Sequence, residues 1–272
     1  MRLLLLIFSQ LIISPTLLSQ SFKNGLDSPI IPLTSHYNEN IEWESVFTDG
    51  KAGKVNRGLV DSEGHAALIF MPSNESRIYK LNGNTGERIW TKTIENTLGF
   101  GITEINDSDR IDYILSGGIS NTQERWIARL NGNNGSIIWS KTYNYTGNSY
   151  QFDGVRMTII GSDGYIYGAG FVGSDEKGTI FIAYGGHAMI MKIDPKDGKE
   201  IWTHLNESTE YAVALVQSND GNLLYGSTEY DEDLTVTKLD KNGNEYWTRP
   251  LKNTSDIIPY DLNLSIHNSL YF

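Results

Sequence analysis

The amino-acid sequence predicts an all-β protein assembled from repeated four-stranded units. A glycine followed four residues later by a tryptophan recurs along the chain. Between these motifs, short runs of alternating apolar and polar residues are separated by Asn-Gly or Asp-Gly turns, which is typical of antiparallel hairpins. Apolar residues spaced by three to four positions, which would indicate amphipathic helices, are hard to find.

The first 19 residues have the layout of a secretory signal peptide. Arg2 precedes an apolar run over residues 3–13, and Ser, Pro, Thr and Gln follow. We expect cleavage after Ser19, with residues 20–40 as a linker and the mature protein secreted, or periplasmic in a bacterium. The alternative is an uncleaved membrane anchor, but polar residues interrupt the run, and a span needs about 20 apolar residues. No membrane span is therefore expected after cleavage.

The tryptophans recur at the interval expected for a propeller blade. They lie at positions 90, 139, 202 and 247, with Trp43 as an earlier, degenerate member, so the spacings are 47, 49, 63 and 45 residues. A period of this length with strand signals inside each unit is typical of a four-stranded blade. We predict that residues 41–272 form a β-propeller with Trp-docking repeats, made of about four complete blades and a partial blade at each end.

The strands of three complete blades can be assigned from the sequence. We expect them at 101–107, 112–119, 125–131 and 136–143, then at 155–161, 165–172, 188–194 and 200–205, then at 212–218, 223–230, 234–240 and 245–251. Residues 261–272 resemble the first strand and the start of the second strand of another blade. Since an open array leaves strand edges unpaired, this pattern favours a truncated propeller over a small open one.

A structural role is expected for the repeated glycine and tryptophan. The polar turn joins the third and fourth strands of each blade, where a glycine can supply the positive φ that the hairpin needs. A tryptophan at a fixed place on the fourth strand can pack against the neighbouring blade, so the four rings are expected to be roughly equivalent and not ligand contacts. The residues concerned are Gly86 with Trp90, Gly135 with Trp139, Gly198 with Trp202 and Gly243 with Trp247.

This motif resembles the tryptophan-docking repeat of the quinoprotein-like (PQQ-like) β-propellers. LNGNTGERIW, residues 81–90, matches it best, whereas Asn134 and Asp197 replace the threonine in the next two repeats. The fourth turn is one residue shorter, and the Trp43 unit has no glycine at the expected place. The resemblance implies the fold but no single function, because such propellers include dehydrogenases, outer-membrane assembly scaffolds and binding modules.

Catalytic chemistry finds little support in the sequence. For an active quinoprotein dehydrogenase, the resemblance implies a carboxylate base, calcium ligands and, in many members, a disulfide of adjacent cysteines, yet the chain has no cysteine. No Asp or Glu can be matched to those positions, so no catalytic or metal residue is assigned. The loop at 240–244 resembles an EF-hand superficially, but its glycine is fourth instead of sixth and no Glu closes it. An acidic cluster is expected to be a solvated loop tip; it consists of Glu229, Asp231, Glu232 and Asp233. The five histidines show no spacing typical of metal ligands; they are His36, His65, His187, His204 and His267.

The surface is expected to bind neither nucleic acid nor anionic membranes, because the net charge is −11.

Residues 173–187 form an insertion that either contacts a partner or covers a funnel opening. Seven Asn-x-Ser/Thr sequons are glycan acceptors if the chain follows a eukaryotic secretory route, and are otherwise turn residues. Their asparagines are Asn74, Asn106, Asn134, Asn144, Asn206, Asn253 and Asn263.

Two functions from different classes agree with these observations. The first is a secreted, non-catalytic β-propeller that offers a rigid binding surface to a protein or a glycan and needs no cofactor. The alternative is a truncated or degenerate oxidoreductase that uses pyrroloquinoline quinone (PQQ) and calcium, as the family resemblance would imply.

Overall fold

The computed structural model describes residues 53–107, 109–144, 152–174, 185–228, 234–252, 263–264 and 270–271. The chain divides into two units, residues 1–46 and 47–272, and all described residues belong to the second. The predicted signal peptide, the linker and the Trp43 unit lie outside them. No helix in the described part of the chain is long and apolar enough to cross a membrane.

The all-β prediction is confirmed, because the described residues form four four-stranded antiparallel sheets and one two-stranded sheet. In chain order, the first sheet holds β1 (Lys54–Val60), β2 (Ala66–Met71), β3 (Glu75–Leu81) and β4 (Arg88–Glu95), and the second holds β5 (Thr97–Asp107), β6 (Arg110–Ile119), β7 (Arg125–Asn131) and β8 (Ile137–Tyr143). The third holds β9 (Phe152–Ile160), β10 (Ile166–Ser174), β11 (His187–Ile193) and β12 (Glu200–Asn206), and the fourth holds β13 (Tyr211–Gln217), β14 (Leu223–Thr228), β15 (Thr235–Leu239) and β16 (Glu245–Pro250).

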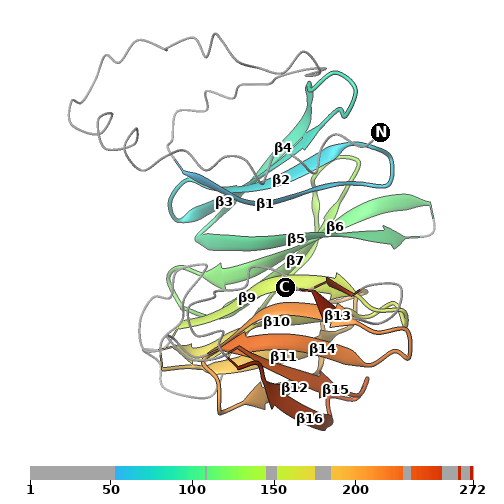
Figure 1. Cartoon of the computed structure of the whole chain (residues 1–272). Coiled ribbons are helices and arrows are strands. Elements are labelled where there is room, and N and C mark those ends of the chain that lie inside the picture. Colours follow the sequence, from blue (N-terminus) through green and yellow to red (C-terminus); the bar gives the residue numbers. More distant parts are fainter. Residues whose placement is uncertain are drawn as a thin grey trace, which may run out of the picture. The chain divides into compact units, whose positions relative to one another are not determined.

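Each four-stranded sheet is a meander in which consecutive strands pair, as expected for a propeller blade. Figure 1 shows the sheets following one another along the chain, from blue through green and yellow to red. Two short strands, β17 (Asn263–Leu264) and β18 (Leu270–Tyr271), pair antiparallel after the fourth sheet, where the sequence predicts the start of another blade.

A β-bulge interrupts the first strand of each four-stranded sheet at the same place. The residues without a cross-strand partner are Asn56, Phe100, Arg156 and Val213. Three of their side chains contact the first strand of the next sheet, since the amide of Asn56 donates to the carbonyl of Gly99, Phe100 lies beside Gly154, and the Arg156 guanidinium lies 5.1 Å from the Tyr211 ring centre. The bulges therefore connect neighbouring sheets near their first strands.

A second bulge lies directly before each docking tryptophan. The pairing of the third and fourth strands skips one residue there, and this residue is exposed although it is apolar. Because an extra residue rotates out of the alternating pattern, the side chain before the tryptophan faces solvent. The exposed residues are Ile89, Ile138, Ile201 and Tyr246.

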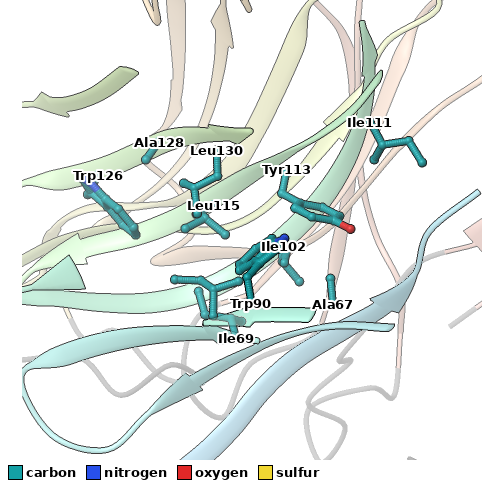
Figure 2. Close-up of a cluster of buried hydrophobic side chains, with 11 residues drawn as sticks. Ala67, Ile69, Trp90, Ile102, Ile111, Tyr113, Leu115, Trp126, Ala128 and Leu130 are labelled. Atoms are coloured by element: carbon teal, nitrogen blue, oxygen red, sulfur yellow. The ribbon is translucent and has the colours of Figure 1, made fainter. Parts of the chain in front are cut away.

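The apolar core lies between successive sheets. Figure 2 shows the cluster between the first and second sheets, in which the rings of Trp90 and Tyr113 lie 6.0 Å apart among aliphatic side chains such as Ile69 and Leu115. Similar clusters join the second sheet to the third and the third to the fourth. Strands such as β10 and β11, in the middle of the third sheet, are buried on both faces and therefore lack the alternation of apolar and polar residues that the sequence pattern predicts.

Candidate functional site

Tryptophans of the first three sheets lie against a glycine of the next sheet. A Cβ atom added to Gly135 would stand 2.8 Å from Cε3 of Trp90, which is closer than any real contact of this kind. The indole therefore occupies space that any other residue would fill. We call each such contact between consecutive sheets a joint. The same close approach recurs at the second joint, between Trp139 and Gly198, and at the third, between Trp202 and Gly243.

These glycines are also needed for their backbone conformation. Their φ angles are 70° at Gly86, 71° at Gly135, 73° at Gly198 and 85° at Gly243. This is the left-handed region, which glycine adopts without a steric cost. Each docked glycine thus meets two requirements, a positive φ and the absence of a side chain where the indole lies. Only the requirement for a positive φ follows from the sequence of its own turn.

One backbone carbonyl at each of the first two joints receives two hydrogen bonds from the preceding sheet. The carbonyl of Gly132 accepts from Nε1 of Trp90 at 2.9 Å and from Nζ of Lys80 at 3.2 Å. At the second joint, the carbonyl of Pro195 accepts from Trp139 Nε1 at 2.9 Å and from Arg129 Nη1 at 3.0 Å. The indole and the cation therefore hold the same turn together.

The third joint is built differently, so the expectation that the tryptophans are roughly equivalent is wrong for their surroundings. Trp202 donates to the carbonyl of Lys241 at 3.2 Å, and its ring is only partly buried, whereas Trp90 and Trp139 are 9% and 8% exposed. Lys192 pairs with Asp163 in its own sheet at 2.8 Å, and among the described residues it donates no hydrogen bond to the turn that Trp202 meets. The turn that Trp202 meets is one residue shorter than the other docked turns, which changes the position of its carbonyl.

A cation opposite each tryptophan pairs with an aspartate, and this was not predicted from the sequence. The cation stands directly across the ladder from the tryptophan in all four sheets. The pairs are Lys80 with Asp61 at 3.2 Å, Arg129 with Asp112 at 2.6 Å, Lys192 with Asp163 at 2.8 Å and Lys238 with Asp220 at 3.1 Å. A sequence signal exists, because a Lys or Arg precedes each tryptophan by ten residues, or by nine where the turn is shorter.

Asp61 also connects the first two sheets. Its carboxylate accepts a 2.6 Å hydrogen bond from the hydroxyl of Tyr113 in the second sheet. Burial alone would raise the pKa of Asp61, but the hydrogen bonds from Tyr113 and from the His65 backbone, together with the charge of Lys80, lower it below its usual value. The carboxylate is therefore ionised and serves the joint between the sheets.

Arg125 is a further buried cation, outside the repeated pairs, at the boundary between the second and third sheets. Its side chain is 4% exposed, and the nearest carboxylate oxygen, on Glu200, lies 3.8 Å away. Nε of Arg125 has no hydrogen-bond acceptor among the residues that the structure describes. Burial lowers the pKa of Arg125, although Glu200 and Asp153 oppose this shift. This charge is less well compensated than those of the repeated pairs.

The three histidines that the structure describes do not come together. His65 accepts from the backbone of Gly83, His187 begins β11, and His204 lies 3.2 Å from the hydroxyl of Tyr225 in the fourth sheet. Burial lowers the pKa of His204. His36 and His267 lie outside the described residues.

A calcium site receives no support from the residues that the structure describes, which contain no cluster of metal-ligating side chains. The carboxylate of Asp240, in the loop that resembles an EF-hand, accepts backbone hydrogen bonds from Asn242 and Asn244, both at 2.8 Å. It is therefore used to close its own turn. The acidic residues 229–233 lie outside the described ranges.

Only the ends of the predicted insertion, residues 173–174 and 185–187, are described. The backbone N–H of Gly173 donates to Asp153, and that of Gly185 donates to Glu210 at 2.7 Å. The middle of the insertion lies outside the described residues. Its role as a partner contact stays a hypothesis.

The sequon asparagines differ in their accessibility. Asn206 is buried, at 8% exposure, and its side chain accepts the backbone N–H of Ser208, which argues against a glycan there in the folded protein. Asn253 lies outside the described residues, and for Asn263 only the backbone is described. Exposed asparagines occur at the other four positions, Asn74, Asn106, Asn134 and Asn144.

Solved structures with a similar fold belong to proteins of different function. Hydrazine synthase of Kuenenia stuttgartiensis matches with a TM-score of 0.55 and 16% identity over 79% of this chain and 60% of its own. Virginiamycin B lyase of Staphylococcus aureus matches with a TM-score of 0.55 and 14% identity over 84% and 65%. The Dos1 propeller matches with a TM-score of 0.50 and 9% identity over 77% and 51%. This chain thus spans less than two thirds of each, and the likeness shows the fold alone.

Sequence comparison identifies the family. No curated protein sequence matches the chain. The family described as outer membrane protein assembly factor BamB matches residues 74–258, which is more than half of the chain and includes all four glycine–tryptophan motifs. The chain therefore belongs to this family of PQQ-like β-propeller repeats.

Proposed function

We propose that the protein is an exported, non-catalytic scaffold that binds another protein. The observation that carries the proposal is the set of three joints, in which an indole ring, a glycine and a backbone carbonyl hold consecutive sheets together. Such joints support a rigid array that presents loops and strand edges at fixed positions. The family description, an outer membrane protein assembly factor, favours a protein over a glycan as the ligand.

The use of the charged side chains supports binding over catalysis. In all four sheets, a Lys or Arg beside the docking tryptophan pairs with an aspartate, and in two joints it also donates to the next sheet. A catalytic carboxylate needs a perturbed pKa and a reacting partner within reach. The lowered pKa of Asp61 has a structural cause instead, because its partners are Tyr113, His65 and Lys80.

Site-specific photo-crosslinking in the source cells tests the proposal. A photoreactive amino acid at Ile138 or Tyr246, which are 40% and 61% exposed, is expected to capture discrete protein partners. The matched control replaces Tyr225, which is fully buried and should capture none. Absence of protein adducts from every exposed position would contradict the scaffold.

A turnover assay distinguishes the scaffold from the alternative, an oxidoreductase that uses PQQ and calcium. The purified chain with PQQ, calcium and an alcohol or sugar is expected to reduce a dye acceptor no faster than a heat-inactivated sample. The assay should be run at high protein concentration, with the mass in solution measured, since oligomers could complete a site. Cofactor-dependent turnover well above the control would favour the enzyme.

A further inference from the structure

His204 connects the third sheet to the fourth beside the third joint. It lies in β12, two residues after Trp202, and its Nε2 stands 3.2 Å from the hydroxyl of Tyr225 in β14. The two rings meet edge to face, with their centres 6.0 Å apart. The imidazole also contacts the backbone of Gly243, in the turn against which Trp202 packs. One side chain of the third sheet therefore bridges two elements of the fourth.

The two contacts together require a neutral imidazole. The contact with Gly243 favours the protonated ring, so the imidazole is the donor there. A neutral imidazole has one donor and one acceptor nitrogen, which leaves Nε2 of His204 to accept from the hydroxyl of Tyr225. A protonated ring has two donors and no acceptor, so it can make only the first contact.

Tyr225 is suited to act as the donor. Burial raises its pKa to about 12, so the hydroxyl keeps its proton at neutral and acidic pH. The side chains of Thr237 and Asn206 lower this pKa, which means that they donate toward the same oxygen. The proton of the hydroxyl is therefore available to His204.

The surroundings of His204 favour its neutral form overall. Burial is the largest influence and lowers the pKa of His204, while the carboxylate of Glu245 at the start of β16 opposes this shift. Within β12, the carboxylate of Glu200 accepts from the hydroxyl of Thr203 at 2.8 Å, and Ile190 stands across the ladder in β11. Further charged groups of β11, β15 and the docked turn bond within their own sheets; they are Lys192, Lys238 and Asp240.

We propose that His204 is a pH-sensitive clamp that holds the fourth sheet to the third and releases it in mildly acidic solution. Protonation turns Nε2 into a donor, so the hydroxyl of Tyr225 loses its acceptor and a positive charge lies in a partly buried position. The third joint is sensitive to such a loss, because the ring of Trp202 is only partly buried. These contacts lie within the protein, so the release does not depend on which partner the scaffold binds.

The direction of the pH effect follows from the two states of His204. Its pKa in the folded protein lies below that in the unfolded chain, so the unfolded chain binds more protons between the two values. The stabilisation is therefore complete above the unfolded-state pKa, which is about 6.5 for histidine. It is lost as the pH falls through the lower, folded-state pKa.

Hydrogen exchange of the full chain at pH 7.5 and at about pH 5 tests the clamp. After correction for the intrinsic exchange rate at each pH, protection of β14 and β15 should fall in acid by at least about twofold relative to β6 and β7. His204→Gln keeps an amide donor and acceptor but cannot titrate, so it should abolish this fall. His187→Gln is the matched control, because His187 begins β11 and should leave the fall unchanged. A wild-type protein without the fall, or a fall that persists in His204→Gln, would overturn the inference.

The titration of His204 in the folded protein gives a test that does not depend on the stability of a histidine variant. The carbon-bound ring protons of His204, followed by NMR, should titrate with a midpoint below that of an ordinary histidine. Tyr225→Phe should raise the midpoint, because it removes the hydroxyl that donates to the neutral ring. Tyr246→Phe, at an exposed tyrosine of the same sheet, is the control and should leave the midpoint unchanged. An ordinary midpoint in the wild type, or equal midpoints in wild type and Tyr225→Phe, contradicts the clamp.

Discussion

Single residues at the joints carry constraints from two sheets at once. Gly198 needs a positive φ for its own turn, and it also leaves room for the ring of Trp139 in the preceding sheet. Gly164 shares the positive φ, at 79°, but no neighbouring atom lies within 4 Å of its missing Cβ. Substitutions at these two glycines therefore allow the cost of conformational strain to be distinguished from the cost of close packing.

We predict that Gly198→Ala destabilises the protein more than Gly164→Ala. Both variants bear the left-handed strain of about 1–2 kcal/mol. Only Gly198→Ala also pushes an indole aside, which adds about 1–3 kcal/mol for overpacking. Urea denaturation of both variants measures the difference, and equal free energies of unfolding would show that the close approach does not matter.

The lowered pKa of Asp61 predicts that its contribution to the stability of the folded protein depends on pH. Its pKa in the folded protein lies below the usual value, so its contribution to stability is complete above the unfolded-state pKa. That contribution is lost as the pH falls through the lower, folded-state pKa. Asp61→Asn should therefore be clearly less stable than wild type at pH 6, and the gap should narrow well below pH 3.8.

The measurement is urea denaturation of Asp61→Asn and wild type across this pH range. Asp194→Asn is a suitable control, because Asp194 lies in a turn and accepts only a local backbone hydrogen bond from Lys196 among the side-chain contacts described. A gap for Asp61→Asn that stays constant down to pH 2 would contradict the assigned role of the carboxylate.

At the scale of strands and sheets, the joints differ in strength. The second joint has two donors on one carbonyl and a ring that is 8% exposed, whereas the third has a single 3.2 Å bond from a partly exposed ring. Buried contacts are more costly to remove than exposed ones. The array is therefore held together unevenly.

We predict that Trp139→Ala lowers the free energy of unfolding by about 3–5 kcal/mol, the usual range for a buried tryptophan. Trp202→Ala should lower it by less, because solvent already reaches part of this ring. Chemical denaturation of the two variants compares the joints directly. An equal or larger loss for Trp202→Ala would contradict the order of strength.

Hydrogen exchange should report the same order without any substitution. In a repeat array, each unit contacts only its neighbours, so a weak joint allows the unit beyond it to open separately. Amides of β14 and β15 in the fourth sheet are expected to exchange faster than those of β6 and β7 in the second. Uniform protection across the four sheets would show that they open together.

At the scale of the whole molecule, the sequence makes a prediction about processing that concerns residues outside the described ranges. The apolar run after Arg2 and the polar residues that follow it have the layout of a cleaved export signal. The mature protein is expected to begin at or near Gln20. N-terminal sequencing of exported material tests this, and an N-terminus at Met1 would contradict it.

Local patterns account for most of what the sequence determined by itself. The blade strands, the all-β class and the place of the glycine turns follow from alternation along the strand and from the φ that a tight hairpin requires. These are properties of neighbours in the chain. The second, third and fourth sheets accordingly begin and end within a few residues of their predicted bounds, the main difference being β5, which starts at Thr97 instead of residue 101.

Tertiary structure alone decided which atoms meet at the joints. The carbonyl of Gly132 and the indole of Trp90 are 42 residues apart, and nothing in either turn specifies the other. The same holds for the ion pairs beside the tryptophans, for the bulges that expose Ile138 and its counterparts, and for the weaker joint at Trp202. Contacts between sheets depend on how a turn of one sheet reaches the face of another, so they appear only when the sheets are packed together.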